Sequence, residues 1–126
     1  MAYHFYNPNP KNKRVGDCSV RAICKALGRS WDDTYISLCS EGLALHDMPS
    51  ANNVWGMYLH RFGFTQKSLP SICPDCTTVA AFAAEHPFGR YVLACQGHVV
   101  CVVDGEYFDS WDSGNEIVLY YWEKEV

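Results

Sequence analysis

The sequence predicts an α+β domain whose amino-terminal helices pack on a carboxy-terminal antiparallel β-sheet. As far as His86, the apolar residues recur at helical spacing between residues typical of helix ends. From Arg90 onward, short β-branched and aromatic runs alternate with Gly, Asp and Asn. Helices followed by strands are typical of this class. The 126 residues are the length of one domain (residues 1–126) with a substantial core.

Four segments of the first part of the chain have helical patterns: residues 17–28, 30–43, 50–63 and 77–86. Gly28 suits a carboxy-terminal cap, because glycine adopts left-handed backbone angles without strain. Ser30 suits an amino-terminal cap, and Ser50 and Gly63 mark the ends of the third helix in the same way. Pro87 stops the fourth helix, since proline cannot continue it.

The second part of the chain predicts a meandering antiparallel sheet. Its expected strands are residues 90–95, 98–103, 106–111 and 116–122, with a further strand at 64–69. Asp104-Gly105 lies between two of these runs and is a preferred pair for a tight two-residue hairpin turn. That turn fixes the strand register and places His98 and Asp109 as diagonal neighbours on one face. Asp112 is an alternative partner if the register slips by one residue.

A histidine beside a carboxylate is half of a nucleophilic site. The carboxylate orients one ring nitrogen, so that the other can accept a proton. Cys18 supplies the missing nucleophile, because it lies where a loop turns into the first helix. Free N–H groups and the helix dipole at that position stabilise a thiolate and can donate to an oxyanion. A cysteine at a helix start is more often simple packing, and the conjunction with His98 and Asp109 favours catalysis.

The stretches "GDCSVRAICKALG" and "GHVVCVVDGEYFDSWDSG" resemble the papain-like cysteine peptidases, in particular small single-domain bacterial and phage members related to bacteriocin-processing peptidases. The resemblance implies a fold with the nucleophile at the start of a helix packed against a sheet that carries the histidine. It implies that Cys18 is the nucleophile, His98 the general base and acid, and Asp109 the orienting residue. It also implies hydrolysis of peptide or isopeptide bonds.

Papain-like enzymes place a side-chain amide, usually glutamine, shortly before the nucleophile to donate to the oxyanion. This chain has no glutamine before Gln66. Asn12, six residues ahead of Cys18, is the substitute that the resemblance suggests. No residues are expected to hold a cofactor or a metal.

Three other functions are compatible with these residues. The same three side chains would serve an acyltransferase of the transglutaminase type, which passes the acyl group to an amine. A papain-like fold without catalysis would be a binding module. Cys73 and Cys76, a Cys-x-x-Cys pair before a helix, would suit a dithiol oxidoreductase, although their position in mid-chain does not match that class.

Composition limits the partners. The net charge of −4 argues against nucleic acid, and Lys11, Lys13 and Arg14 form only a short basic cluster. We find no apolar run of the length of a signal peptide or membrane span, so we expect a cytoplasmic protein. The seven cysteines show no disulfide framework, which predicts free thiols. The expected partner is a peptide or protein substrate.

Overall fold

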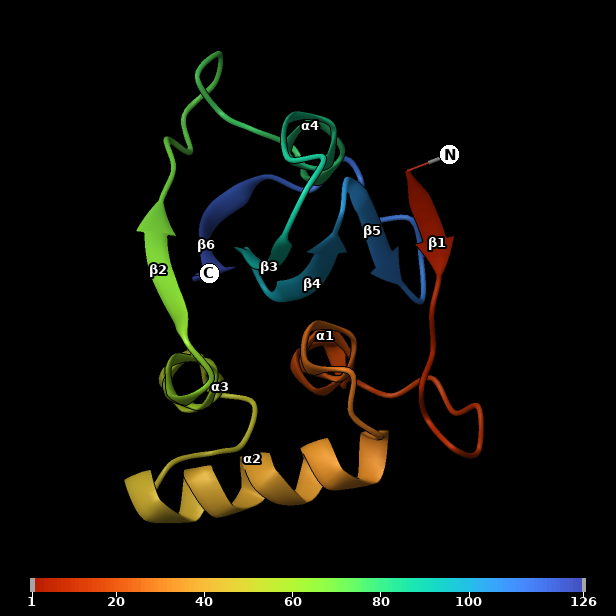
Figure 1. Ribbon diagram of the computed structural model, residues 1–126, viewed down its shortest axis with the longest axis vertical. Coiled ribbons are helices and arrows are strands. Elements are labelled where there is room, and N and C mark those ends of the chain that lie inside the picture. The colour runs from red at the N-terminus through yellow and green to blue at the C-terminus, as the bar shows by residue number, and fades with distance from the viewer. Residues whose placement is uncertain (1, 126) are drawn as a thin grey trace.

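The computed structural model describes residues 2–125, which form four helices and six strands (Figure 1). In chain order these are β1 (Tyr3–Phe5), α1 (Cys18–Leu27), α2 (Trp31–Leu45), α3 (Asn52–Arg61), β2 (Phe64–Ser68), α4 (Val79–Glu85), β3 (Arg90–Cys95), β4 (His98–Val103), β5 (Glu106–Asp109) and β6 (Val118–Lys124). The α+β class is therefore confirmed.

The six strands form one mixed sheet in the order β1-β5-β4-β3-β6-β2. Strand β1 runs parallel to β5, and the other neighbours are antiparallel. The prediction of a purely antiparallel meander is thus wrong in two respects, since β1 was not expected and β6 inserts between β3 and β2. Strand β1 has three residues, too few for alternation to be visible in the sequence.

Helices cover both faces of the sheet (Figure 1). Helices α1 and α3 lie against one face, α2 lies outside them, and α4 lies on the opposite face. Each face has its own apolar core. Ile23 of α1 and Cys101 of β4 belong to the first core, whereas Phe82 of α4 and Val100 of β4 belong to the second. Because side chains alternate between the two faces along β4, this strand contributes residues to both cores.

The predicted boundaries agree with the structure at both ends of the first helix and at the start of the second. Gly28 caps α1 in the left-handed region (φ 66°), and the Ser30 hydroxyl accepts a hydrogen bond from the Asp33 N–H at the start of α2. Helix α2 continues to Leu45, beyond the predicted end at residue 43. The third helix has Ala51 as its cap, one residue later than expected, because residues around Ser50 form a turn.

The hairpin between β4 and β5 has the predicted register. Val103 pairs with Glu106 and Cys101 with Phe108. Asp104 and Gly105 both have positive φ (49° and 82°), as a tight turn between twisted strands requires. This register carries His98 and Asp109 to the same end of the sheet, since His98 begins β4 and Asp109 ends β5.

Two cysteines are not free thiols, contrary to expectation. Cys73 and Cys76 form a disulfide in the loop between β2 and α4, with their Cα atoms 4.7 Å apart. The intervening residues turn the chain sharply enough to bring the two Cα atoms into the range of a disulfide. The other five cysteines are free.

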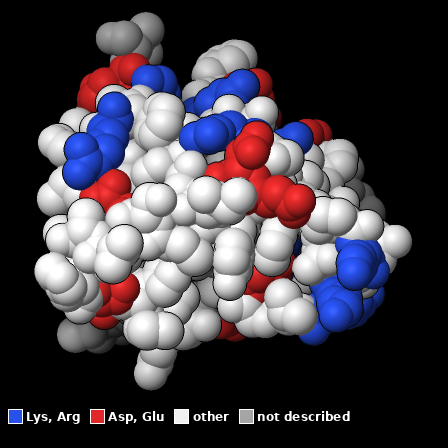
Figure 2. Space-filling view, turned by 90° about the horizontal axis from the view of Figure 1, so that it is seen from below, with Lys and Arg blue, Asp and Glu red and all other residues white. Residues whose placement is uncertain are grey.

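Figure 2 shows the face on which α2 lies, and a broad part of it is uncharged. Ile36, Leu43 and Met48 contribute exposed apolar side chains from α2 and the turn after it. The described residues visible on this face form no continuous basic tract. Within residues 2–125, no helix has both the length and the apolar composition needed to span a bilayer.

Candidate active site

Cys18 is the first residue of α1, directly after the capping residue Asp17. Asp17 makes no side-chain hydrogen bond to the helix start, because its carboxylate is engaged by Arg21 and Trp31. The first N–H groups of an α-helix have no partner within the helix. The N–H groups of Cys18 and Ser19 are therefore left for a ligand at the helix start.

His98 and Asp109 are in direct hydrogen-bond contact. The His98 Nε2 lies 2.6 Å from Asp109 Oδ2, and both side chains are buried. Cys18 lines the same groove as His98, and each of these two side chains shifts the pKa of the other. Because Asp109 engages Nε2, Nδ1 is the ring nitrogen left for the sulfur. Cys18, His98 and Asp109 thus come together at one end of the sheet.

The environment of Cys18 favours its thiolate. Burial alone would raise the pKa of the thiol, but hydrogen bonds from the His98 ring and the Val99 backbone N–H outweigh it. The positive charges of His98 and Arg21 act in the same direction, and the pKa of Cys18 is lowered. A thiolate at a helix start beside an imidazole is a nucleophile ready to attack a carbonyl.

The imidazole is held in its protonated form. Burial alone would lower the pKa of His98, but its hydrogen bonds to Asp109 and Cys18, and the charges of both, raise the pKa to about 9. Since the thiol pKa is lowered while the imidazole pKa is raised, Cys18 and His98 form a thiolate–imidazolium pair that titrates as a unit.

Asp109 is held by donors on all sides. It accepts hydrogen bonds from the Ser113 hydroxyl (2.6 Å), the Ser110 N–H (2.8 Å) and the Arg21 guanidinium (2.9 Å), besides His98. Burial alone would raise the pKa of Asp109, but the hydrogen bonds from His98 and Ser113 and the charges of His98 and Arg21 lower it. The carboxylate therefore stays ionised and fixed in orientation.

Arg21 connects the helix that begins at Cys18 with the strand that ends at Asp109. One guanidinium nitrogen binds Asp17 Oδ1 at 2.5 Å, and the other binds Asp109 Oδ1. The Trp31 indole binds the second oxygen of Asp17 at 2.9 Å. The sequence alone did not assign Arg21 to the site. Its position one helical turn after Cys18 was the available signal.

An open groove of about 320 Å³ runs past the sulfur. Its walls include the loop before α1 on one side and Gly97, His98 and Trp111 on the other. The Trp111 ring packs on the His98 ring with centroids 4.8 Å apart, so it shields one face of the imidazole. The groove gives a substrate access to the thiolate.

Two sequence-predicted residues lie apart from this groove. Asp112 accepts a hydrogen bond from the Tyr107 hydroxyl and does not bind His98, so the alternative register is wrong and Asp109 is the partner. Asn12, expected to donate to the oxyanion, is exposed in a turn with φ 55° and does not line the groove. Its turn ends six residues before Cys18, and Arg14, Val15 and Gly16 occupy the groove wall instead.

Three of the other free thiols are buried and have raised pKa values. Burial raises the pKa of Cys24, Cys95 and Cys101, in the last two to about 12. Within residues 2–125, no three His, Cys, Asp or Glu side chains come together as a metal site. Comparisons with protein-family models, curated proteins and solved structures found no match for this chain.

Proposed function

We propose that this protein is a cysteine peptidase that cleaves peptide or isopeptide bonds through an acyl-enzyme. The observation that carries the proposal is that Cys18 and His98 line the same groove, while Asp109 Oδ2 holds the His98 Nε2 at 2.6 Å. A general base must lie within hydrogen-bond reach of its nucleophile and be oriented by a third group. These three side chains meet that requirement.

The reaction follows from the charges of the resting pair. The Cys18 thiolate attacks the substrate carbonyl carbon, and the carbonyl π electrons move to oxygen. As the oxyanion collapses, the C–N bond breaks and the His98 imidazolium gives its Nδ1 proton to the leaving amine. Water then attacks the thioester, His98 takes a proton from it, and the C–S bond breaks to regenerate the thiolate.

The oxyanion donors in this proposal are backbone N–H groups at the start of α1. Asp17 does not occupy them, because Arg21 and Trp31 hold its carboxylate away from the helix end. Such preorganised donors account for a large share of the rate in acyl transfer. Asn12 has no part in this mechanism.

The order of elements supports the resemblance to papain-like peptidases. The nucleophile begins a helix in the first part of the chain, and the histidine and acid come from strands packed behind that helix. The resemblance extends to the proposed roles of Cys18, His98 and Asp109, and it makes a peptide or protein the proposed substrate.

The test begins with the thiol itself. The native protein is treated with limiting iodoacetamide near neutral pH, and the adducts are mapped by mass spectrometry. We expect Cys18 to react faster than Cys39, the other half-buried free thiol, and His98→Ala to remove most of that advantage. Equal rates at the two cysteines, or no effect of His98→Ala in a protein that remains folded, would contradict the proposal.

The second part of the test asks what the acyl-enzyme does. The protein is incubated with a proteome-derived peptide mixture, with Cys18→Ala as the control, and new termini are identified. Products with new carboxylates indicate hydrolysis. Adducts formed with added glycinamide indicate acyl transfer to an amine. Binding of peptides without cleavage, by both the native protein and Cys18→Ala, would favour a binding module.

A further inference from the structure

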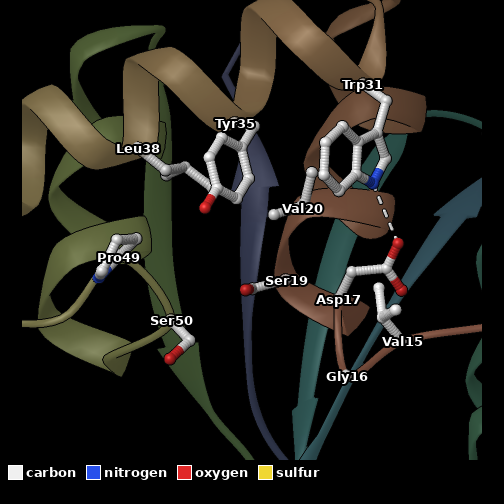
Figure 3. Close-up of a pocket in the computed structure, with 10 residues that line it drawn as sticks. All are labelled: Val15, Gly16, Asp17, Ser19, Val20, Trp31, Tyr35, Leu38, Pro49 and Ser50. Atoms are coloured by element: carbon white, nitrogen blue, oxygen red, sulfur yellow. Dashed lines mark hydrogen bonds between the residues drawn. The ribbon is translucent and has the colours of Figure 1, made fainter. Parts of the chain in front are cut away.

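We propose that an apolar pocket beside the start of α1 binds a large apolar side chain of the substrate, close to the scissile bond. This inference rests on the proposed peptidase function and adds the substrate class to it. The pocket lies among α1, α2 and the turn before α3, so it belongs entirely to the helical side of the molecule (Figure 3).

The walls of the pocket are mainly apolar. In Figure 3 the rings of Trp31 and Tyr35 descend from α2, Val20 projects from α1, and Pro49 and Ser50 close the far side. The two rings stack with centroids 5.0 Å apart. Tyr35 is nevertheless 47% exposed. Aromatic surface is thus left open to solvent at the pocket, and a ligand side chain would bury it.

The one charged residue in the pocket wall, Asp17, already has its charge paired. The carboxylate of Asp17 receives the Trp31 indole N–H on one oxygen and the Arg21 guanidinium on the other. The dashed line in Figure 3 marks the first of these bonds. Since Asp17 already has its partners, the pocket offers no free charge to a ligand. A lysine or aspartate side chain placed there would lose water without a countercharge.

The pocket lies next to the groove that contains Cys18. Val15, Gly16 and Asp17 line both. A Cβ atom added to Gly16 would meet no atom within 4 Å, so a peptide can pass over this position. An extended peptide advances about 3.3 Å per residue, which places the bound side chain within a few residues of the bond that Cys18 attacks.

The size of the pocket suits a bulky side chain. Its volume is about 260 Å³. An apolar cavity of about 150 Å³ holds a benzene ring. Leucine, methionine or phenylalanine therefore fits, while glycine and alanine leave most of the apolar surface uncovered.

The experiment uses tripeptidyl acyloxymethyl ketones in which one position at a time is Gly, Leu, Phe, Asp or Lys. The Cys18 thiolate displaces the carboxylate of the reagent and forms a C–S bond, and mass spectrometry gives the rate. At one position we expect Leu and Phe to react about ten- to hundredfold faster than Gly, Asp or Lys, as burial of one large side chain allows.

Two pairs of variants locate the effect. Ser50→Phe adds a ring to the far side of the pocket and should abolish the preference, whereas Ser40→Phe, an exposed site on α2 outside the pocket, should keep it. Tyr35→Ala removes one wall and should weaken the preference for Phe severalfold, unlike Ile36→Ala, the exposed neighbour on the same helix. Iodoacetamide rates at Cys18, measured in every variant, separate a loss of thiol reactivity from a loss of the preference, and the control variants Ser40→Phe and Ile36→Ala should react as fast as the native protein.

The outcomes separate the two proposals. Selective iodoacetamide labelling of Cys18 without any apolar preference, or a preference that Ser50→Phe leaves intact, would overturn the pocket and leave the peptidase. A Cys18 that shows no selective labelling would overturn both.

Discussion

Two thiols lie near the His98–Asp109 pair on different sides of the sheet. The pKa of one thiol is lowered, and the pKa of the other is raised. Cys18 enters from α1, where donors from His98 and Val99 lower its pKa against the effect of burial. Cys95 pairs with His98 across β3 and β4 and packs in the core under α4. Burial and the charges of Glu116, Asp109 and Cys18 raise its pKa to about 12.

The difference shows that nearness to a histidine is not enough to activate a cysteine. The carboxylate of Asp109 influences the pKa of both thiols, but in different ways. Asp109 acts on Cys95 directly and raises its pKa, whereas it acts on Cys18 through His98, whose positive charge it stabilises. Hydrogen-bond donors directed at the sulfur therefore decide which thiol becomes a nucleophile.

The largest effect on activity should come from replacing each of these two cysteines by alanine. We expect Cys18→Ala to lower peptide cleavage by about 10³-fold or more, because it removes the nucleophile. Cys95→Ala should retain the activity of the native protein in folded material, since the Cys95 thiol is protonated and faces the other core. Cleavage rates on one peptide measure both. Loss of activity in Cys95→Ala with Cys18→Ala still active would reverse the assignment.

The second effect concerns the ion pairs that hold the helix and the sheet together at Cys18. Arg21→Met leaves the buried carboxylates of Asp17 and Asp109 without their cation, which costs about 3–5 kcal/mol of unfolding free energy when a buried pair is broken. It also removes a positive charge that lowers the pKa of Cys18. Urea denaturation measures the first effect, and the pH dependence of alkylation measures the second.

The matched control for Arg21 is Lys67→Met, which breaks an ion pair with Glu123 on the exposed side of β2 and β6. Exposed pairs contribute little because water screens them. We expect a much smaller loss of stability and no change in the alkylation profile of Cys18. Equal losses in the two variants would mean that Arg21 is not a special link between the helix and the sheet.

The third effect is a shift of a pH profile. The imidazolium is present below about pH 9 and is lost above it, so activity should fall on the alkaline side near that pH. Asp109→Asn removes the carboxylate that raises the pKa of His98, and the alkaline limb should move down by about one to three pH units. The pKa of Cys95 should fall in this variant, because Asp109 raises it in the native protein. The pKa of Cys18 should rise, because a less protonated His98 lowers it less.

Asp112→Asn is the control for Asp109→Asn, because Asp112 binds the Tyr107 hydroxyl and not His98. Its alkaline limb should stay near pH 9 when cleavage rates are measured across pH. A shift in Asp112→Asn equal to that in Asp109→Asn would show that Asp109 does not set the pKa of His98.

Local signals in the sequence predicted the hairpin that brings His98 and Asp109 together. Asp104-Gly105 fixed the register of β4 and β5, and that register alone brought His98 and Asp109 to one end of the sheet. The caps Gly28 and Ser30 bounded the helices that hold Cys18 in place. These features depend on residues close in sequence, so they can be inferred without knowing the fold.

Long-range contacts could not be inferred in the same way. Strand β1 is three residues long and is defined by its pairing with β5, more than a hundred residues later. Arg21 can bind both Asp17 and Asp109 only at the observed distance between α1 and β5. The hydrogen bond from Ser113 to Asp109 depends on how the chain turns after β5. No periodicity in the sequence encodes such distances.

The smallest expected effect concerns Asn12, the residue that the papain-like resemblance suggested for the oxyanion. Loss of an oxyanion donor lowers kcat by about 10²–10³-fold. Asn12→Gly should instead leave kcat/KM within about twofold of the native value, because Asn12 is exposed outside the groove and glycine accepts its positive φ. A loss of a hundredfold would place Asn12 at the reacting carbonyl. Stabilisation of the oxyanion would then depend on more than the backbone donors at the start of α1.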